Sequence, residues 1–190
     1  MGIDLSIITG EEYIKRIDNL KNEVWIEGEQ VKGKISEHPA FQGILKSKAA
    51  LYDLQHDPTS GAILTRTSVE NNEQFNFAFE QPTTKEDLKK RRVATQLWAK
   101  NSAGTIGRSP DYVNTVIMTL GTSYPFFKGR YADNIQNILS NALKNDLSFT
   151  HTFVNPQVNR SPHHNEFTSV NNKDTKDKII GAKGISPPRK

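Results

Sequence analysis

Apolar residues recur three and four positions apart in five stretches of the chain, which is the spacing of an amphipathic α-helix. The stretches cover residues 9–20, 36–54, 83–104, 110–121 and 131–143. In the last stretch the repeat gathers six apolar residues on one helix face: Tyr131, Ile135, Ile138, Leu139, Ala142 and Leu143. The pattern therefore predicts that most of the first 146 residues are helical.

Polar residues mark where two of these helices begin. Thr9 with Glu12, and Thr83 with Glu86, have the spacing of a capping box. In this motif each side chain bonds to the backbone N–H group of the other residue. Gly121 predicts the end of the fourth helix, because glycine is common where helices stop.

The stretch GRSPDY at residues 107–112 predicts the start of the fourth helix. Ser109 is a favourable N-cap, Pro110 suits the first helical position and Asp111 complements the helix dipole. Capping rules alone predict that the Arg108 side chain is solvated and that the Tyr112 side chain is half-buried.

Short alternating runs between the helices predict two small β-hairpins. One is VWIEGEQV, which turns at Glu27-Gly28, and the other pairs AILTRT with FNFAF around ENNEQ. The stretch HDPTSG at residues 56–61 is predicted to be a turn that closes the second helix.

At Leu147 the repeat becomes alternating, with Leu147, Phe149, His151 and Phe153 on one face of a predicted strand. The remaining segment of about 40 residues is too small to fold alone. We therefore expect a mainly α domain with small β-hairpins over residues 1–146. Over residues 147–190 we expect the truncated start of a β-domain and a disordered tail.

Composition excludes several classes of protein. The chain has 190 residues, of which 35% are hydrophobic and 24% charged, as in soluble globular proteins. It has no membrane-spanning apolar run and no secretory leader, so we expect a cytoplasmic protein without a membrane partner. Because it contains no cysteine, it can hold neither a disulfide nor a thiolate-bound zinc ion or iron–sulfur cluster.

The formal net charge of +4 arises entirely in the tail, since residues 1–150 carry 18 basic and 18 acidic side chains. The tail's basic residues are scattered rather than clustered, which argues against nucleic-acid binding. His163 and His164 are adjacent but have no further ligands nearby in the sequence, so we expect no metal site.

Four long motifs occur in order along the chain: LYDLQHDP, RRVATQLWA, GRSPDYVN and HTFVNPQVNR. With these motifs the sequence resembles the 4-hydroxyphenylacetate 3-hydroxylase family over residues 6–183. The resemblance implies an acyl-CoA dehydrogenase-like architecture, in which a helical N-terminal domain precedes a β-domain and a C-terminal helical domain. It also implies that this chain covers only the first domain and the start of the second.

Members of that family are oxygenase components of two-component flavin monooxygenases, and full-length members are homotetramers. A separate flavin reductase supplies reduced FAD, and oxygen from O2 is added to the ring carbon beside a phenol hydroxyl. The resemblance implies that Arg108, Tyr112 and His151 surround that hydroxyl. A guanidinium beside a helix N-terminus would favour the phenolate form of the substrate, and a histidine can exchange protons near neutral pH.

The resemblance also assigns the flavin contacts to one motif. The implied FAD-binding residues are His151, Thr152, Phe153, Gln157, Val158, Asn159 and Arg160. Amides, backbone donors and one arginine suit a pyrophosphate or the polar edge of a flavin. Without the family, NPQVNR is a surface turn and His151 is a half-buried histidine satisfied by one hydrogen bond.

Two alternatives to an active hydroxylase remain open. One is a catalytically inactive remnant with weak or no flavin binding. The other is an FAD-containing 4-hydroxybutyryl-CoA dehydratase, but those enzymes need cysteine ligands for an iron–sulfur cluster in this region, and the chain has none.

Overall fold

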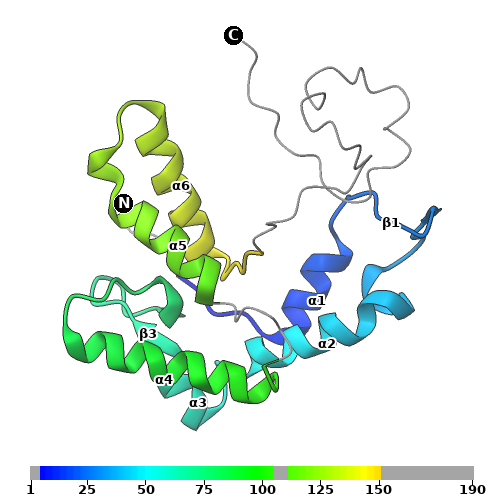
Figure 1. The fold of residues 1–190 in the computed structure, drawn as a ribbon, viewed down its shortest axis with the longest axis horizontal. Coiled ribbons are helices and arrows are strands. Elements are labelled where there is room, and N and C mark those ends of the chain that lie inside the picture. The colour runs from blue at the N-terminus through cyan, green and yellow to red at the C-terminus, as the bar shows by residue number, and fades with distance from the viewer. Residues whose placement is uncertain (1–4, 105–110, 151–190) are drawn as a thin grey trace, which may run out of the picture.

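The computed structural model describes residues 5–104 and 111–150 (Figure 1). These residues form α-helices, short 3-10 helices and two two-stranded antiparallel sheets. In chain order the elements are α1 (Gly10–Asp18), β1 (Trp25–Ile26), β2 (Glu29–Gln30), η1 (Ile35–Glu37), α2 (Pro39–Asp53), α3 (Pro58–Leu64), β3 (Thr65–Thr67), β4 (Gln74–Asn76), η2 (Phe77–Phe79), α4 (Lys85–Asn101), α5 (Asp111–Thr122), η3 (Tyr124–Phe126) and α6 (Arg130–Lys144). The prediction of a mainly helical chain with small hairpins is confirmed.

Three apolar clusters hold the elements together. The first joins α2, α3, η2 and α4 around Trp98, and the second joins α1 to α2 around Tyr13 and Tyr52. The third joins η2, α5 and α6 around Phe79 and Met118. In Figure 1 the paired helices α5 and α6 therefore stand on one side, α1 and α2 on the other, and η2 connects the first cluster to the third.

The predicted first helix and first hairpin are confirmed. The Thr9–Glu12 capping box is present, with the Thr9 backbone N–H donating to Glu12 Oε2 at 2.7 Å. The β1–β2 hairpin turns at Glu27 and Gly28, whose φ angles are 51° and 88°. Two consecutive positive φ angles match the right-handed twist of a hairpin, and glycine adopts them without strain.

The capping residue of α4 lies one position beyond the predicted one. Thr84 is the N-cap, and it forms the capping box with Asp87. The Asp87 carboxylate also accepts the Thr83 N–H at 3.2 Å, whereas Glu86 pairs with Lys89. The prediction failed because both threonines precede an acidic residue at the same spacing.

The prediction of a turn at residues 56–61, followed by a strand from Ala62, was wrong. Asp57 accepts hydrogen bonds from the Thr59 and Ser60 N–H groups and begins α3. Pro58 occupies the first turn, where its missing N–H group costs nothing. The strand β3 starts only at Thr65, which pairs with Asn76.

The prediction of a strand across FNFAF holds only at its start. The Asn76 side chain accepts a hydrogen bond from the Ala78 N–H at 2.9 Å and begins the 3-10 helix η2. Phe77 then packs into the first cluster and Phe79 into the third. The alternation of aromatic residues therefore reflects a 3-10 turn that directs Phe77 and Phe79 into different apolar clusters.

Gly121 does not end α5, contrary to the prediction, because the helix continues to Thr122. A Cβ atom at Gly121 would lie 2.3 Å from Leu139 Cδ2, so the glycine permits close packing of α5 on α6. On α6 the predicted apolar face is only partly buried, since Ala142 is inaccessible while Tyr131 is 61% exposed. Ser109 and Pro110, predicted at the start of α5, lie outside the described residues.

The strand predicted from Leu147 is absent over the part that the structure describes, residues 147–150. There Leu147 and Phe149 pack against the third cluster instead. The rest of that strand and the tail predicted to be disordered fall at residues 151–190, outside the described part. No helix within residues 5–104 and 111–150 is long and apolar enough to cross a membrane.

The α5–α6 contact predicts opposite effects for two glycine substitutions. Gly121→Ala should lower the free energy of unfolding by about 1–3 kcal/mol, because the new methyl group would displace Leu139. Gly43→Ala on α2 is the matched control, because no described residue outside its own stretch of helix lies within 4 Å of the added Cβ. It should raise the free energy of unfolding by about 0.5–1 kcal/mol through helix propensity. Urea unfolding measures both, and equal effects would contradict the packing role of Gly121.

Candidate functional site

Of the residues assigned to the site from the sequence, Tyr112 lies among those described. It occupies the first turn of α5, and 41% of its surface is exposed. Arg108, His151 and the six remaining flavin residues lie outside the described part: Thr152, Phe153, Gln157, Val158, Asn159 and Arg160. Two described segments border the predicted site in the sequence, namely the start of α5 and residues 145–150.

A buried asparagine joins these two segments. Asn114 follows Tyr112 by two positions, and only 1% of its surface is exposed. Its Nδ2 donates a hydrogen bond to the Leu147 carbonyl oxygen at 3.1 Å. The first turns of α5 are thus bonded to the segment that leads into HTFVNPQVNR.

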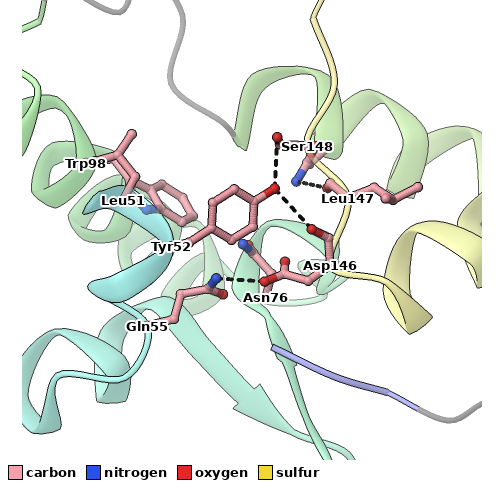
Figure 2. Close-up of a pocket in the computed structure, with 9 residues that line it drawn as sticks. Leu51, Tyr52, Gln55, Asn76, Trp98, Asp146, Leu147 and Ser148 are labelled. Atoms are coloured by element: carbon pink, nitrogen blue, oxygen red, sulfur yellow. Dashed lines mark hydrogen bonds between the residues drawn. The ribbon is translucent and has the colours of Figure 1, made fainter. Parts of the chain in front are cut away.

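Side chains of α1 and α2 hold the same segment from the other side, and Figure 2 shows the contacts made by Tyr52 of α2. Arg16 donates to the Asn145 carbonyl oxygen and, at 3.2 Å, to the Tyr52 hydroxyl. The Tyr52 hydroxyl donates to the Asp146 carbonyl oxygen at 3.1 Å and lies 2.9 Å from Ser148 Oγ. These bonds satisfy backbone groups of a segment that has no strand partner among the described residues.

Tyr52 remains protonated over an unusually wide pH range. Burial raises the pKa of its hydroxyl from 10.0 to about 12. Its ring stacks on Tyr13 with the centroids 4.8 Å apart, which fixes the direction of the hydroxyl.

The Asp146 side chain is buried, with 1% of the residue's surface exposed. Its backbone adopts a left-handed conformation with a φ angle of 43°. Its Oδ2 accepts hydrogen bonds from Gln55 Nε2 at 2.8 Å and from the Ile8 N–H at 3.2 Å. Burial raises the pKa of the carboxyl group, and the hydrogen bonds from Gln55 and Ile8 oppose that shift.

Of two hollows in the described part of the chain, neither combines the size and charge that FAD requires. The first, lined by Asp146 and its neighbours, has a volume of about 10 Å³. The second is an open groove of about 650 Å³ between α1 and α2. Glu11 and Asp53 place two carboxylates there beside the single lysine Lys46, an unfavourable setting for a pyrophosphate. Residues 5–104 and 111–150 also contain no cluster of three or more metal-ligating side chains.

Neither the apolar repeat nor the motifs predicted a role for Tyr52, Gln55, Asn114 or Asp146. The first three lie within the motifs LYDLQHDP and GRSPDYVN, but the motifs alone do not show which residues meet. Asn114 and Leu147 are 33 positions apart, and Gln55 and Asp146 are 91 apart. Such contacts leave no periodic pattern in a single sequence.

Comparisons with known proteins agree on one family. The sequence pattern described as "4-hydroxyphenylacetate 3-hydroxylase N terminal" matches residues 9–183. A probable 4-hydroxyphenylacetate 3-monooxygenase of Bacillus subtilis is 45% identical over 160 residues, covering 83% of this chain and 33% of that protein. The oxygenase component of 4-hydroxyphenylacetate 3-monooxygenase from Thermus thermophilus is 43% identical over 153 residues, covering 80% of this chain and 31% of that protein.

Comparison with solved structures points to the same family. A crystal structure of a 4-hydroxyphenylacetate 3-monooxygenase oxygenase component with FAD and 4-hydroxyphenylacetate matches with a TM-score of 0.72 and 43% identity, over 80% of this chain and 31% of that one. An archaeal 4-hydroxybutyryl-CoA dehydratase from N. maritimus shares the fold at 17% identity and a TM-score of 0.61, over 75% of this chain and 28% of that one. The chain thus spans about a third of the length of the relatives it matches.

The buried hydroxyl of Tyr52 predicts a stability loss that depends on pH. Tyr52→Phe should lower the free energy of unfolding near neutral pH by about 1–3 kcal/mol, because buried partners lose their hydrogen bonds. Since the folded-state pKa is raised, the hydroxyl's contribution is complete below pH 10.0 and is lost as the pH rises toward about 12.

Denaturant unfolding of both proteins at neutral and alkaline pH measures this difference. The gap between wild type and Tyr52→Phe should shrink at the higher pH. Tyr131→Phe, at a side chain that is 61% exposed, should stay within about 0.5 kcal/mol of wild type. A gap that is constant from neutral pH to about pH 12 would contradict the burial of the Tyr52 hydroxyl.

Proposed function

Because the chain belongs to the 4-hydroxyphenylacetate 3-hydroxylase family, we propose that it supplies the N-terminal part of an oxygenase component that hydroxylates a phenol. The observation that carries the proposal is its similarity in sequence and structure to an oxygenase component solved with FAD and 4-hydroxyphenylacetate. The proposed substrates are a phenol, O2 and reduced FAD, and the proposed partner is a flavin reductase. The name "oxygenase component" itself implies a second component.

The proposed architecture follows the acyl-CoA dehydrogenase-like arrangement. Residues 1–146 would form the helical N-terminal domain, and residues 147–190 would begin the β-domain. The described helices and the similarity to the N-terminal regions of the relatives support the first part of this proposal. Assembly into a homotetramer is proposed for the full-length enzyme.

In the proposed site, Arg108, Tyr112 and His151 act on the phenol hydroxyl. The guanidinium of Arg108 would stabilise the phenolate oxygen, and the His151 imidazole would accept the phenolic proton. The Tyr112 hydroxyl would hydrogen-bond to the same oxygen and orient the ring. Loss of the proton makes the ring carbon beside the oxygen a better nucleophile, so these residues prepare the position that is hydroxylated.

The described contacts support bringing these residues together. Tyr112 lies two positions before Asn114, and His151 lies four positions after Leu147. The hydrogen bond from Asn114 to Leu147 joins the two segments. Four residues of extended chain span at most about 14 Å, so the proposal requires no rearrangement of the described part.

Reduced FAD, when bound, supplies the activation of O2. The residues proposed to hold it are His151, Thr152, Phe153, Gln157, Val158, Asn159 and Arg160. Their chemistry suits the cofactor, because hydroxyl, amide and guanidinium donors match a pyrophosphate and the polar edge of a flavin. Phe153 offers an apolar surface that can exclude water from the reacting ring.

A catalytically inactive form is the second candidate function. This candidate concerns the 190 residues by themselves, which correspond to about a third of the length of the relatives they match. The dehydratase alternative is weaker, because the likeness to that enzyme concerns the fold alone and the chain has no cysteine for an iron–sulfur cluster.

The isolated 190-residue chain should bind FAD weakly and should not hydroxylate 4-hydroxyphenylacetate. In the proposed architecture a later domain completes the flavin site, and that part of the relatives has no counterpart here. Titration of flavin fluorescence measures binding, and product analysis with a reductase measures turnover. Tight binding and sustained hydroxylation by the isolated chain would show that it is a complete oxygenase.

The three phenol residues can be tested in a hybrid enzyme in which this chain replaces the matching third of the Bacillus subtilis relative. Arg108→Ala should slow hydroxylation by about tenfold to a hundredfold, since a charge-assisted contact contributes about 1.5–3 kcal/mol. His151→Ala should also slow it, and Tyr112→Phe should cost less because only a neutral hydrogen bond is lost. In each variant FAD oxidation should continue and release peroxide instead of product.

The product-to-peroxide ratio and the melting temperature, measured side by side, separate catalysis from folding. Arg92→Ala is the matched control, because Arg92 is an exposed arginine on α4. It should leave both quantities unchanged. If the ratio is unaltered in Arg108→Ala, Tyr112→Phe and His151→Ala, these residues are not part of the phenol site.

A further inference from the structure

Three buried oxygen atoms around one small cavity have no hydrogen-bond partner among residues 5–104 and 111–150. They are Gln55 Oε1, Asn114 Oδ1 and Asp146 Oδ1. The exposed fractions of these residues are 4%, 1% and 1%. All three line the cavity of about 10 Å³ between α2, α5 and the segment after α6 (Figure 2).

The other polar atom of each side chain is already engaged, and this fixes its orientation. Gln55 Nε2 donates to Asp146 Oδ2 at 2.8 Å. Asn114 Nδ2 donates to the Leu147 carbonyl oxygen at 3.1 Å. Rotating either amide by 180° would exchange its nitrogen and oxygen, break that hydrogen bond and bring two acceptor oxygens together. The amide orientations that leave Gln55 Oε1 and Asn114 Oδ1 without a donor are therefore the favoured ones.

Three clustered acceptors require donors. A buried acceptor without a partner costs free energy, and native proteins pair nearly all such groups. The cavity volume is close to the smallest that holds one water molecule, and its polar lining offers the partners that a buried water needs.

We propose that this cavity is a binding site for a single water molecule held by a neutral Asp146. The Oδ1–H group of Asp146 donates to the water oxygen, and the water donates its two hydrogens to Gln55 Oε1 and Asn114 Oδ1. One carboxyl proton and two water hydrogens satisfy all three acceptors and bring no net charge into the interior. The site would link α2, α5 and the segment after α6 independently of the proposed function.

The positive charge of Arg16 opposes the neutral form of Asp146, but burial has the larger effect. The charged or titratable groups that face it among the described residues are Arg16 of α1 and Tyr52 of α2. Arg16 directs its guanidinium to the carbonyl oxygens of Asn145 and Asp146 and to the Tyr52 hydroxyl. From β4 and α5 the neutral amides of Asn76 and Asn114 face the site. Burial favours the protonated carboxyl group.

The competing occupant is a monovalent cation beside an ionised Asp146. It would also satisfy three oxygen acceptors. The two possibilities differ in how stability responds to pH and to the choice of salt, and both can be measured on the 190-residue chain.

The variant Asp146→Asn tests the protonation state, because an amide presents an N–H group where the neutral acid presents its O–H. Unfolding of both proteins is followed by denaturant titration from about pH 4 to pH 8. The variant should match wild type at the acidic end and become the more stable protein as the pH rises. Each unit by which folding raises the pKa of Asp146 should multiply the unfolding equilibrium constant of wild type by about ten relative to the variant.

Asp133→Asn, an exposed position on α6, is the matched control and should show no such divergence. Parallel pH curves for wild type and Asp146→Asn would overturn the proposal. So would an Asp146→Asn chain that fails to fold at any pH, because a neutral acid must tolerate a neutral amide of the same shape.

Salt identity tests the occupant. At pH 8 and equal ionic strength, chlorides of sodium, potassium and N-methylglucamine should give wild type the same melting temperature. A crystal structure of the chain at acidic pH should show one water within hydrogen-bond distance of all three oxygens. Stabilisation by sodium or potassium alone, lost in Asp146→Asn, would overturn the proposal in favour of the cation.

Discussion

The described structure depends on how the backbone carbonyl groups of the segment after α6 find hydrogen-bond donors in the protein interior. Residues 145–148 follow α6 without joining a strand, and side chains from α1, α2 and α5 bond to them. Their backbone groups are bonded by the side chains of Arg16, Tyr52 and Asn114. A buried backbone carbonyl group needs a hydrogen-bond donor. These side chains supply the donors that a neighbouring strand would supply in a sheet.

That junction also ties the apolar clusters together. Tyr52 belongs to the cluster between α1 and α2, while Leu147 packs against the cluster between α5 and α6. The polar bonds at residues 146 and 147 therefore connect these two clusters. The two segments of the proposed phenol site both leave from this junction, so its rigidity would control how closely those residues meet.

Local rules predicted the helices well and their boundaries less well. The apolar repeat located α1, α2, α4, α5 and α6, because burial of one helix face leaves a periodic pattern in the sequence. The boundary at Thr83 and Thr84 was ambiguous, since each threonine has an acid at capping-box distance. The pair Asp57-Pro58 predicts a turn but begins a helix, because in both structures an aspartate side chain accepts hydrogen bonds from backbone N–H groups just after it.

The sequence by itself determined the helical class, the first capping box, the β1–β2 hairpin and, through its long motifs, the family. Only the tertiary structure decided that Gly121 packs against Leu139 instead of ending a helix, and that Asn114 bonds to Leu147. Periodicity and capping involve neighbours within one or two turns, so one sequence can report them. A buried polar contact joins residues many tens of positions apart, and its partner is selected only when the packed helices bring the two groups together.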